Sequence, residues 1–451
     1  MAVGLGLVTD LYELTMAASY LRRGMTKSAT FSLFARKLPP SRGFLVAAGL
    51  DDVLRLLPQY SFDDADLTWL AGHGFDAPTL DAFRELRFSG DVWAIPEGHV
   101  VFPDEPLIEV TAPLPEAQLV ETILLNQITY QTALATKAAR CRLAAGGRAA
   151  LVDFSLRRTH GLEAGMAAAR AAAIAGFAGT SNVEAARRLG MPAVGTMAHS
   201  YIQAFPSERE AFVAFAEDFP DRITFLVDTY DTLTGVETAL GVADALDLRG
   251  RLGVRLDSGD LLVLSKQARC LFDAAGRQDV TIVASGGLDE FDVQRLLEEG
   301  APIDTFGVGT KIGVSADAPS LDTAYKLVEY AGRPVMKLSP AKQTRPGPKQ
   351  VYRGDLEAGD VLATRSEPAP PGYSPLLIQV MRAGECTAPI EPVAVAADRL
   401  STDLAGLPTA SRELRTPTAV SVRVSERLEA LTRDVREAHR PASPAPLWAD
   451  G

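Results

Sequence analysis

The sequence predicts an α/β protein built on an irregular, incomplete parallel α/β barrel, with an N-terminal α/β domain and a small C-terminal extension. Between residues 150 and 310, short apolar runs alternate with helical segments, the pattern of repeated βα units and a parallel sheet. Polar residues and glycines gather directly after these runs, where a parallel barrel carries its functional groups. Together these observations favour a barrel with a functional rim.

The barrel prediction rests on seven apolar runs that we expect to be strands. They span 149–154, 176–180, 193–197, 223–228, 252–257, 280–285 and 305–309. The expected intervening helices span 165–175, 182–189, 208–217, 233–247, 260–275 and 290–299. Asn182 and Asp289 can cap two of them through their side-chain oxygens. Seven strands are one fewer than a complete barrel needs, and the sequence does not decide whether the sheet closes.

The segments before and after the predicted barrel have a different sequence pattern. We expect an N-terminal α/β domain over 1–145 that is joined by 325–400, the barrel over 146–325, and a C-terminal helix and tail over 401–451. Expected elements outside the barrel are helices at 11–23, 119–145 and 419–439, strands at 30–38, 90–95, 325–330 and 335–338, turns and short strands in the proline-rich 101–115, and a disordered tail at 441–451.

Composition limits the function classes. The chain has 451 residues, 47% of them hydrophobic, enough for two or three domains, since single cores stop growing at about 250–300 residues. Lys and Arg total 45 against 57 acidic residues, a net charge of −12. Nucleic-acid or anionic-membrane binding needs a basic field, so we expect neither. A few local arginines can still bind a small anion.

Localisation is predicted from the cysteines and from the apolar runs. Cys141, Cys270 and Cys386 are odd in number and far apart, which indicates neither a disulfide framework nor a paired metal site. No apolar stretch approaches the ~20 residues of a membrane span, and the first residues lack the pattern of a secretion signal. We expect a cytoplasmic protein.

Polar side chains follow each predicted strand, and a parallel barrel brings such strand ends to one rim. A single polar residue after a strand can have an ordinary structural role, but such roles do not explain the same bias at seven strand ends. In chain order these residues are Asp153, Arg157, Arg158, Thr180, Ser181, Thr196, His199, Asp228, Arg255, Asp257, Ser258, Ser285, Gly286, Gly287, Gly309 and Thr310.

Two of these ends are rich in glycine, at 285–287 and 307–310. Glycine lets backbone N–H groups approach a phosphate, and a following helix N-terminus adds positive potential. Either segment alone is as compatible with an ordinary turn. Because both follow the last strands of the barrel, where phosphates usually bind, we predict a phosphate site there.

Four further positions have both a functional and a structural explanation. Arg157 and Arg158 form a surface charge pair or a fork for carboxylate or phosphate. His199 is a structural or a reactive histidine, and Asp228 can orient its imidazole from the next strand end. Asp257 suits ribose hydroxyls, a water-bound magnesium ion, or the cap of the next helix. The chain has neither a GxxxxGK[ST] loop nor a GxSxG elbow, which disfavours kinase-type nucleotide folds and serine hydrolases.

Nine segments in order resemble the motifs of nicotinate phosphoribosyltransferases. They are LVTDLYELTM (7–16), FARKLP (34–39), SLRR (155–158), GTSN (179–182), GTMAHS (195–200), VDTY (227–230), RLDSG (255–259), GVGT (307–310) and YKLV (325–328). The resemblance covers about residues 5 to 340, and its motifs are highly specific. Residues beyond about 355 are not diagnostic.

The resemblance implies a type II phosphoribosyltransferase fold and a homodimer whose active sites are shared between chains. It implies formation of nicotinate mononucleotide and pyrophosphate from nicotinate and phosphoribosyl diphosphate, for NAD salvage, with magnesium and with coupled hydrolysis of ATP. By position, Tyr12 would contact the nicotinate ring, with Thr196 and Arg255 beside it. His199 would be the histidine that ATP phosphorylates, and Asp257 would lie near the ribose.

The remaining implied roles concern anionic groups. Gly286, Gly287, Gly309 and Thr310 match the phosphate loops. Arg157 or Arg158, with Lys137 or Arg140, would hold the anionic groups of the substrates. The metal ligands are not implied at individual positions.

Ser181 bears on the choice of ring substrate. Related nicotinamide enzymes carry aspartate at this position, which would repel the carboxylate of nicotinate by about 4 kcal/mol at 4 Å and an effective dielectric near 20. Ser181 therefore favours the acid over the amide. Two departures from the family pattern lie nearby: Asp153-Phe154-Ser155 replaces Glu-Phe-Gly or Glu-Met-Gly, and Thr159-His160 replaces Ala-Gln.

Other readings remain open from the sequence. A nicotinamide phosphoribosyltransferase is the nearest alternative enzyme, and quinolinate phosphoribosyltransferase shares the fold but would release carbon dioxide without needing ATP. A non-catalytic sensor of phosphoribosyl diphosphate is an alternative of another class.

Overall fold

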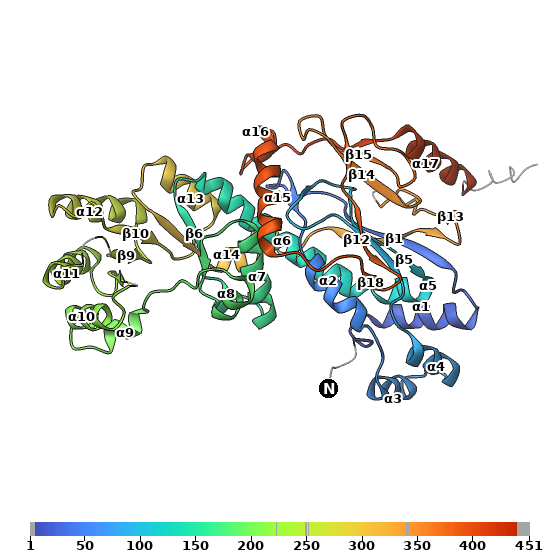
Figure 1. Cartoon of the computed structure of the whole chain (residues 1–451), viewed down its shortest axis with the longest axis horizontal. Helices are drawn as coiled ribbons and strands as arrows, with labels where there is room; N and C mark the ends of the chain where they lie inside the picture. Colours follow the sequence, from blue (N-terminus) through green and yellow to red (C-terminus); the bar gives the residue numbers. More distant parts are fainter. Residues whose placement is uncertain (1–4, 222, 249, 251, 340–341, 440–451) are drawn as a thin grey trace, which may run out of the picture. The chain divides into compact units, whose positions relative to one another are not determined.

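The computed structural model describes residues 5–221, 223–248, 250, 252–339 and 342–439 (Figure 1). The chain divides into two compact units. Unit 1 comprises Met1–Thr132, Ser320–Glu391 and Arg399–Gly451, and unit 2 comprises Ala133–Pro319 and Pro392–Asp398. The first boundary falls inside the long helix α6 (Glu121–Ala145), whereas the sequence predicted it at the end of that helix. The predicted tail at 441–451 lies outside the described residues.

Unit 2 contains the predicted parallel sheet. In its described residues six strands pair in the order β7-β6-β11-β10-β9-β8, and every pairing is parallel. Their bounds are β6 (Ala150–Asp153), β7 (Gly179–Thr180), β8 (Thr224–Leu226), β9 (Gly253–Leu256), β10 (Thr281–Ala284) and β11 (Thr305–Val308). Because β7 and β8 are the outer strands of this order, the sheet is open, which confirms the incomplete barrel.

The helices of unit 2 fall where the sequence places them. They are α7 (Leu162–Ile174), α8 (Val183–Leu189), α10 (Glu208–Asp218), α11 (Thr232–Ala245), α12 (Leu261–Ala274) and α13 (Glu290–Glu298). Asn182 and Asp289 cap α8 and α13 as predicted, and Asp289 forms a full capping box with Asp292. Three short elements were not predicted: η2 (Leu156–Arg158), α9 (His199–Gln203) and α14 (Thr310–Gly313).

The expected strand at 193–197 is wrong. The described residues there make only an isolated bridge between Ala193 and Thr180, with Val194 N donating to Thr180 O at 2.9 Å. Pro192 has no N–H to donate, and β7 offers only two residues for pairing. The segment therefore leaves the sheet and continues as a loop to His199.

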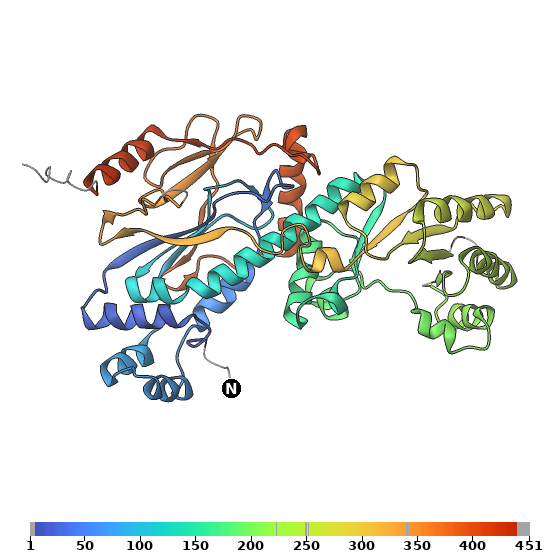
Figure 2. The same cartoon turned by 180° about the vertical axis from the view of Figure 1, so that it is seen from behind.

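Unit 1 is built on an antiparallel sheet, seen from behind in Figure 2. In the described residues its order is β13-β12-β1-β5-β3-β17-β18. The strands are β1 (Ser28–Ala35), β3 (Asp91–Ala94), β5 (Pro106–Pro113), β12 (Thr323–Tyr330), β13 (Arg333–Pro334), β17 (Ile378–Arg382) and β18 (Glu385–Cys386). Helix α1 (Leu11–Arg22) packs on α5 (Leu114–Leu119), which packs on β1 and β5.

The proline-rich segment 101–115 differs from the expectation of turns and short strands, because it contains the eight-residue strand β5. Its prolines, Pro106 and Pro113, stand at the two ends of the strand, where a missing N–H disturbs the ladder least. The expected strand at 335–338 does not form, and β12 pairs instead with β13. The remaining elements before α5 are β2 (Leu45–Val46), β4 (Val100–Val101), α2 (Leu50–Leu56), η1 (Leu57–Gln59), α3 (Asp64–Gly72) and α4 (Ala77–Glu85).

Residues Ser320–Glu391 belong to unit 1, as expected for 325–400, and the C-terminal helix predicted after 401 falls in the same unit. They add a second sheet of order β16-β14-β15-β19. Its strands are β14 (Lys349–Arg353), β15 (Val361–Thr364), β16 (Ser374–Pro375) and β19 (Arg423–Val424), and the helices are α15 (Val393–Gly406), α16 (Thr409–Arg412) and α17 (Glu426–Ala438).

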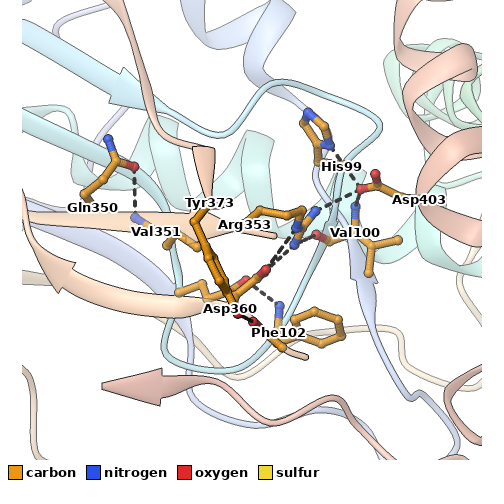
Figure 3. Close-up of polar contacts among 11 residues, drawn as sticks. His99, Val100, Phe102, Gln350, Val351, Arg353, Asp360, Tyr373 and Asp403 are labelled. Atoms are coloured by element: carbon orange, nitrogen blue, oxygen red, sulfur yellow. Dashed lines mark hydrogen bonds and ion pairs between the residues drawn. The ribbon is translucent and has the colours of Figure 1, made fainter. Parts of the chain in front are cut away.

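A buried charge network joins these segments within unit 1 (Figure 3). Arg353 forms ion pairs with Asp360 and Asp403, and the Asp403 pair spans 2.9 Å. Oδ2 of Asp403, the atom that pairs with Arg353, also accepts from Val100 N at 2.8 Å and lies 3.0 Å from Nδ1 of His99. One carboxylate therefore links strand β4, strand β14 and helix α15. In the part of the chain that is described, no helix is long and apolar enough to cross a membrane.

Candidate active site

Arg255 is the centre of a hydrogen-bond network at the carboxyl ends of β9 and β10. Its Nε donates to Ser285 Oγ at 2.8 Å and its Nη2 to Asp257 Oδ1 at 2.6 Å. Its Nη1 donates to Thr196 Oγ1 at 3.1 Å, and the guanidinium lies over the ring of Phe154 at 5.5 Å. The structure thus brings together Thr196, Arg255, Asp257 and Ser285, four of the predicted residues, and adds Phe154.

The carboxylate of Asp257 is stabilised in its ionised form. Burial alone would raise the pKa of Asp257, but hydrogen bonds from Ser285 and Arg255 and the charge of Arg255 outweigh it. The pKa therefore lies below its usual value, and Asp257 stays ionised at neutral pH. An ionised carboxylate beside a guanidinium that is held in place on three sides suits ligand hydroxyl groups.

His199 begins helix α9, and its imidazole is oriented by a neighbour that sequence reasoning missed. Nδ1 of His199 lies 3.1 Å from Oγ1 of Thr229. Asp228, which we expected in this role, instead uses Oδ2 to accept from Asp257 N at 3.0 Å and from Ser258 Oγ at 2.5 Å. The VDTY motif contains both residues, but adjacent positions after a strand point in different directions, so the motif alone did not tell them apart.

Thr180 is buried inside the rim. Its hydroxyl donates to Asp153 Oδ2 at 2.6 Å and accepts from Asn182 N at 3.0 Å, so its contacts are structural. Asp153 also accepts from Ser155 N at 2.9 Å. Ser181 follows at the rim and is half-buried, with its backbone N–H bonded to Asp153 O. Of this predicted pair, the structure leaves Ser181 as the residue able to face a ligand.

Arg157 and Arg158 lie in the short helix η2, directly after β6. Both side chains are exposed. Neither guanidinium has a hydrogen bond or ion pair with another residue that the structure describes. Two uncommitted arginines at a strand end can grip an anion from outside the network of Arg255.

The glycine turns approach the same network through their backbones. Gly286 has a φ of +99°, and a Cβ there would stand 2.0 Å from the carbonyl oxygen of Asp257. Gly287 follows with a φ of +70°, and a Cβ at Gly309 would stand 2.8 Å from the carbonyl oxygen of Phe154. Glycine is therefore needed at 286 and 309 for close backbone packing, and Thr310 begins α14 beside Gly309.

Lys137 and Arg140, which we predicted for anionic substrate groups, are fully buried in ion pairs. Glu290 lies 2.5 Å from Lys137 Nζ and 2.8 Å from Arg140 Nε, and Asp317 lies 3.1 Å from Lys137 Nζ. Buried cations that already have carboxylate partners are structural groups. We therefore leave both out of the proposed phosphate site.

Tyr12 lies in unit 1, on helix α1, and its side chain is 46% exposed. Burial of the phenol and the nearby Glu121 and Glu13 raise the pKa of Tyr12, so it stays a neutral hydrogen-bond donor. Glu13 itself is fully buried and accepts from Thr122 Oγ1 at 2.6 Å. The structure supplies an exposed, anchored ring at this position in unit 1.

The described residues contain no group of three or more His, Cys, Asp or Glu side chains that could hold a metal ion. The groups that the rim does offer are positive and hydroxyl groups for an anionic ligand, an ionised carboxylate and a half-buried imidazole. This combination fits the handling of a phosphorylated sugar beside a nucleophilic histidine.

Comparisons with known proteins agree with this chemistry. The model of the nicotinate phosphoribosyltransferase N-terminal domain matches residues 7–129, and that of the nicotinate phosphoribosyltransferase family matches residues 149–357. Nicotinate phosphoribosyltransferase pncB2 of Mycobacterium tuberculosis is 48% identical over 96% of this chain and 95% of its own length. Nicotinate phosphoribosyltransferase of Bacillus subtilis is 46% identical over 77% of this chain and 73% of its own.

Solved structures give the same relationship. The crystal structure of human nicotinic acid phosphoribosyltransferase superposes with a TM-score of 0.84 at 32% identity, covering 95% of this chain and 99% of that one. The match spans both units and confirms the resemblance seen in the motifs. The chain belongs to the nicotinate phosphoribosyltransferase family and is an enzyme of that kind.

Proposed function

We propose that this enzyme joins the ring nitrogen of nicotinate to C1 of phosphoribosyl diphosphate, releasing pyrophosphate and forming nicotinate mononucleotide for NAD salvage. One observation carries this proposal: Arg255, Asp257, Ser285 and Thr196 form one hydrogen-bond network at the rim. His199 and Thr229 form a separate pair, and His199 interacts electrostatically with Asp257 of the network. The rim thus offers a fixed positive charge, an ionised carboxylate and a nucleophile.

The nicotinate ring would lie beside Arg255 and Thr196. Arg255 is held on three sides, so its charge stays fixed while the substrate carboxylate binds, and Ser181 adds no opposing charge. Tyr12 of a second chain would cover the ring. During the reaction the C1–O bond to pyrophosphate breaks as the C1–N bond forms, through an oxocarbenium-like transition state.

The sugar and phosphate groups would use the neighbouring strand ends. Asp257 is ionised and can accept hydrogen bonds from ribose hydroxyls. The backbone turns at 286–287 and 309–310 would hold the phosphate, and Arg157 and Arg158 would hold the diphosphate.

His199 would couple ATP to synthesis. An imidazole nitrogen attacks the γ-phosphorus of ATP, the bond from that phosphorus to the bridging oxygen of ADP breaks, and the phosphoryl group passes to His199. Later hydrolysis of the phosphohistidine returns the enzyme to its first state. The contact with Thr229 supports this proposal because it holds the ring in one orientation.

Magnesium would enter with its phosphate substrates, where it neutralises the charge of the leaving pyrophosphate. The described residues offer no three-residue cage for it, which fits an ion held mainly by phosphate oxygens and water. We assign no protein ligand.

We also propose a homodimer in the cytoplasm. Large side chains are strongly exposed near the rim: Leu162 at 82% and Val183 at 72% begin helices α7 and α8, and Tyr230 at 66% lies in the loop before α11. Leu11, beside Tyr12, is 60% exposed. A second chain would cover these groups. Cys141, Cys270 and Cys386 are free thiols.

Product analysis tests the proposal. The protein is mixed with magnesium, ATP, phosphoribosyl diphosphate and either nicotinate, nicotinamide or quinolinate, and the nucleotides are separated. Nicotinate mononucleotide and pyrophosphate, with faster synthesis when ATP is present, are the expected products. Preference for nicotinamide, release of carbon dioxide from quinolinate, or binding of phosphoribosyl diphosphate without turnover would each support one of the alternatives instead.

A further inference from the structure

Glu13 is a fully buried acid in the first turn of helix α1, directly after Tyr12. Its Oε1 accepts from Thr122 Oγ1 at 2.6 Å, and its Oε2 accepts from Thr9 Oγ1. No ion pair joins Glu13 to another residue that the structure describes. Because a buried carboxyl group is costly unless it is hydrogen-bonded, the two threonine contacts are what allow Glu13 to stay inside unit 1.

The two threonines belong to different segments of unit 1. Thr9 lies just before α1, and its Oγ1 is also 3.4 Å from Leu119 O at the end of α5. Thr122 lies in the first turn of α6, and its Oγ1 accepts from Asp10 N at 3.3 Å. Glu13 therefore ties the chain that leads into α1 to the start of α6.

The start of α1 lacks the usual side-chain cap. Asp10 occupies the N-cap position, but its carboxylate makes no capping hydrogen bond. The first N–H groups of a helix have no partner within the helix, so an uncapped first turn opens readily. Here Glu13 N donates to Asp10 O at 3.0 Å, and Asp10 N is held by Thr122. Order in this turn thus depends on the contacts that Glu13 organises.

Tyr12 is the residue that this turn presents to solvent. Its side chain is 46% exposed, whereas that of Glu13 is fully buried. Successive residues of an α-helix point about 100° apart, so anchoring Glu13 on the inside directs Tyr12 outward. An aromatic ring fixed before binding loses less conformational entropy when a ligand packs on it.

We propose that Glu13 is a positioning residue, which orders the first turn of α1 so that Tyr12 is held ready to cover the nicotinate ring in the active site of a second chain. The inference rests on the proposed function, because that function gives Tyr12 its ligand. Glu13 itself is buried and touches neither substrate.

The kinetic test compares Glu13→Leu with Glu13→Gln in the intact enzyme. Leucine cannot accept from Thr9 or Thr122, so Glu13→Leu should raise KM for nicotinate about tenfold, as expected when a binding group is misplaced. KM for phosphoribosyl diphosphate should stay nearly unchanged, since Tyr12 covers only the ring. Glutamine keeps an acceptor and the length of the side chain, so Glu13→Gln should restore a near-normal KM for nicotinate.

Glu367 provides the matched control, because this carboxylate of unit 1 also accepts from two hydroxyls but lies outside α1 and α6. It accepts from Thr364 Oγ1 at 2.9 Å and from Ser425 Oγ at 2.8 Å. Glu367→Leu should leave KM for nicotinate as it is. If Glu13→Leu does not fold, Thr122→Val takes its place, since it removes one donor and keeps the shape of the side chain.

A double-mutant cycle shows whether Glu13 acts through Tyr12. In a Tyr12→Ala background, Glu13→Leu should cause no further rise in KM for nicotinate. The same tenfold rise in that background, or an equal rise in both KM values for Glu13→Leu alone, would overturn the inference.

Hydrogen exchange separates this inference from the proposed function. Backbone amides in peptides that cover residues 9–16 should exchange faster in Glu13→Leu, on the order of tenfold, and at the normal rate in Glu13→Gln and Glu367→Leu. Unchanged exchange in Glu13→Leu would overturn the inference whatever the enzyme makes. Faster exchange in a protein that forms no nicotinate mononucleotide would refute the proposed function while supporting the role of Glu13 in ordering Tyr12.

Discussion

Oγ1 of Thr229 lies 3.1 Å from Nδ1 of His199, which makes a hydroxyl the neighbour of the imidazole that we propose as the phosphoryl acceptor. A hydroxyl can donate or accept, whereas a carboxylate at neutral pH only accepts. Thr229 can therefore stay bonded to the ring in either neutral tautomer. Asp228, the residue before it, is directed to the backbone of Asp257 instead.

Thr229→Val should slow phosphorylation of the enzyme by ATP about tenfold, because it removes the hydroxyl and keeps the shape of the side chain. The measurement is the rate of appearance of acid-labile phosphate on the protein. Thr229→Ser is the control and should phosphorylate at nearly the normal rate. Unchanged phosphorylation in the valine variant would show that the contact does not orient His199.

His199→Ala should abolish the stimulation of synthesis by ATP while leaving slow basal turnover, because the ring and sugar sites do not depend on the imidazole. Initial rates with and without ATP provide the measurement. His160→Ala is a suitable control, since His160 is exposed and near the arginine pair. If ATP still stimulates His199→Ala, the phosphohistidine proposal is wrong.

Ser181→Asp should lower kcat/KM for nicotinate by at least about tenfold, since a second carboxylate near the ring opposes the substrate carboxylate with up to about 4 kcal/mol. Turnover of nicotinamide, which carries no such charge, should fall less. Ser181→Ala separates the effect of charge from loss of the hydroxyl. Equal losses for both substrates would place Ser181 away from the carboxylate.

Glu290→Gln should reduce the free energy of unfolding by about 3–5 kcal/mol, because it leaves two buried cations, Lys137 and Arg140, without their shared carboxylate. Chemical denaturation at neutral pH measures the change. Glu299→Gln, at an exposed pair with Arg295 near the end of α13, should cost less than about 1 kcal/mol. A small effect at Glu290 would mean that Asp317 alone neutralises the cations.

Much of unit 2 was predictable, because its strands are short apolar runs and its helices have clear start signals. Asn182 and Asp289 are capping residues that can be recognised in the sequence, and each marks the observed start of its helix. The prediction of a strand at 193–197 failed because its pairing depends on the length of the neighbouring strand β7, which no local pattern reveals. Whether the sheet closes also depends on which strands pair, and no local pattern reveals this either.

The candidate site was predictable as a set of residues but not as a set of contacts. Strand ends identified Arg255, Asp257 and Ser285, which the structure joins. Lys137 and Arg140 have the right chemistry for phosphate, yet both form ion pairs with Glu290, more than 140 residues later in the chain. Thr229 escaped notice because its value depends on which neighbour folding brings beside it.

The bonds of Asp403 to Arg353 and Val100 impose an order on synthesis of the protein. Unit 2 is almost continuous in the chain, so it can fold while the ribosome is still adding residues after 319. In unit 1, strands β4 and β14 cannot be joined through Asp403 until position 403 has emerged. Nascent chains arrested near residue 380 would therefore resist protease across 133–319 but be cut within 1–132, so the part of the protein made first is completed last.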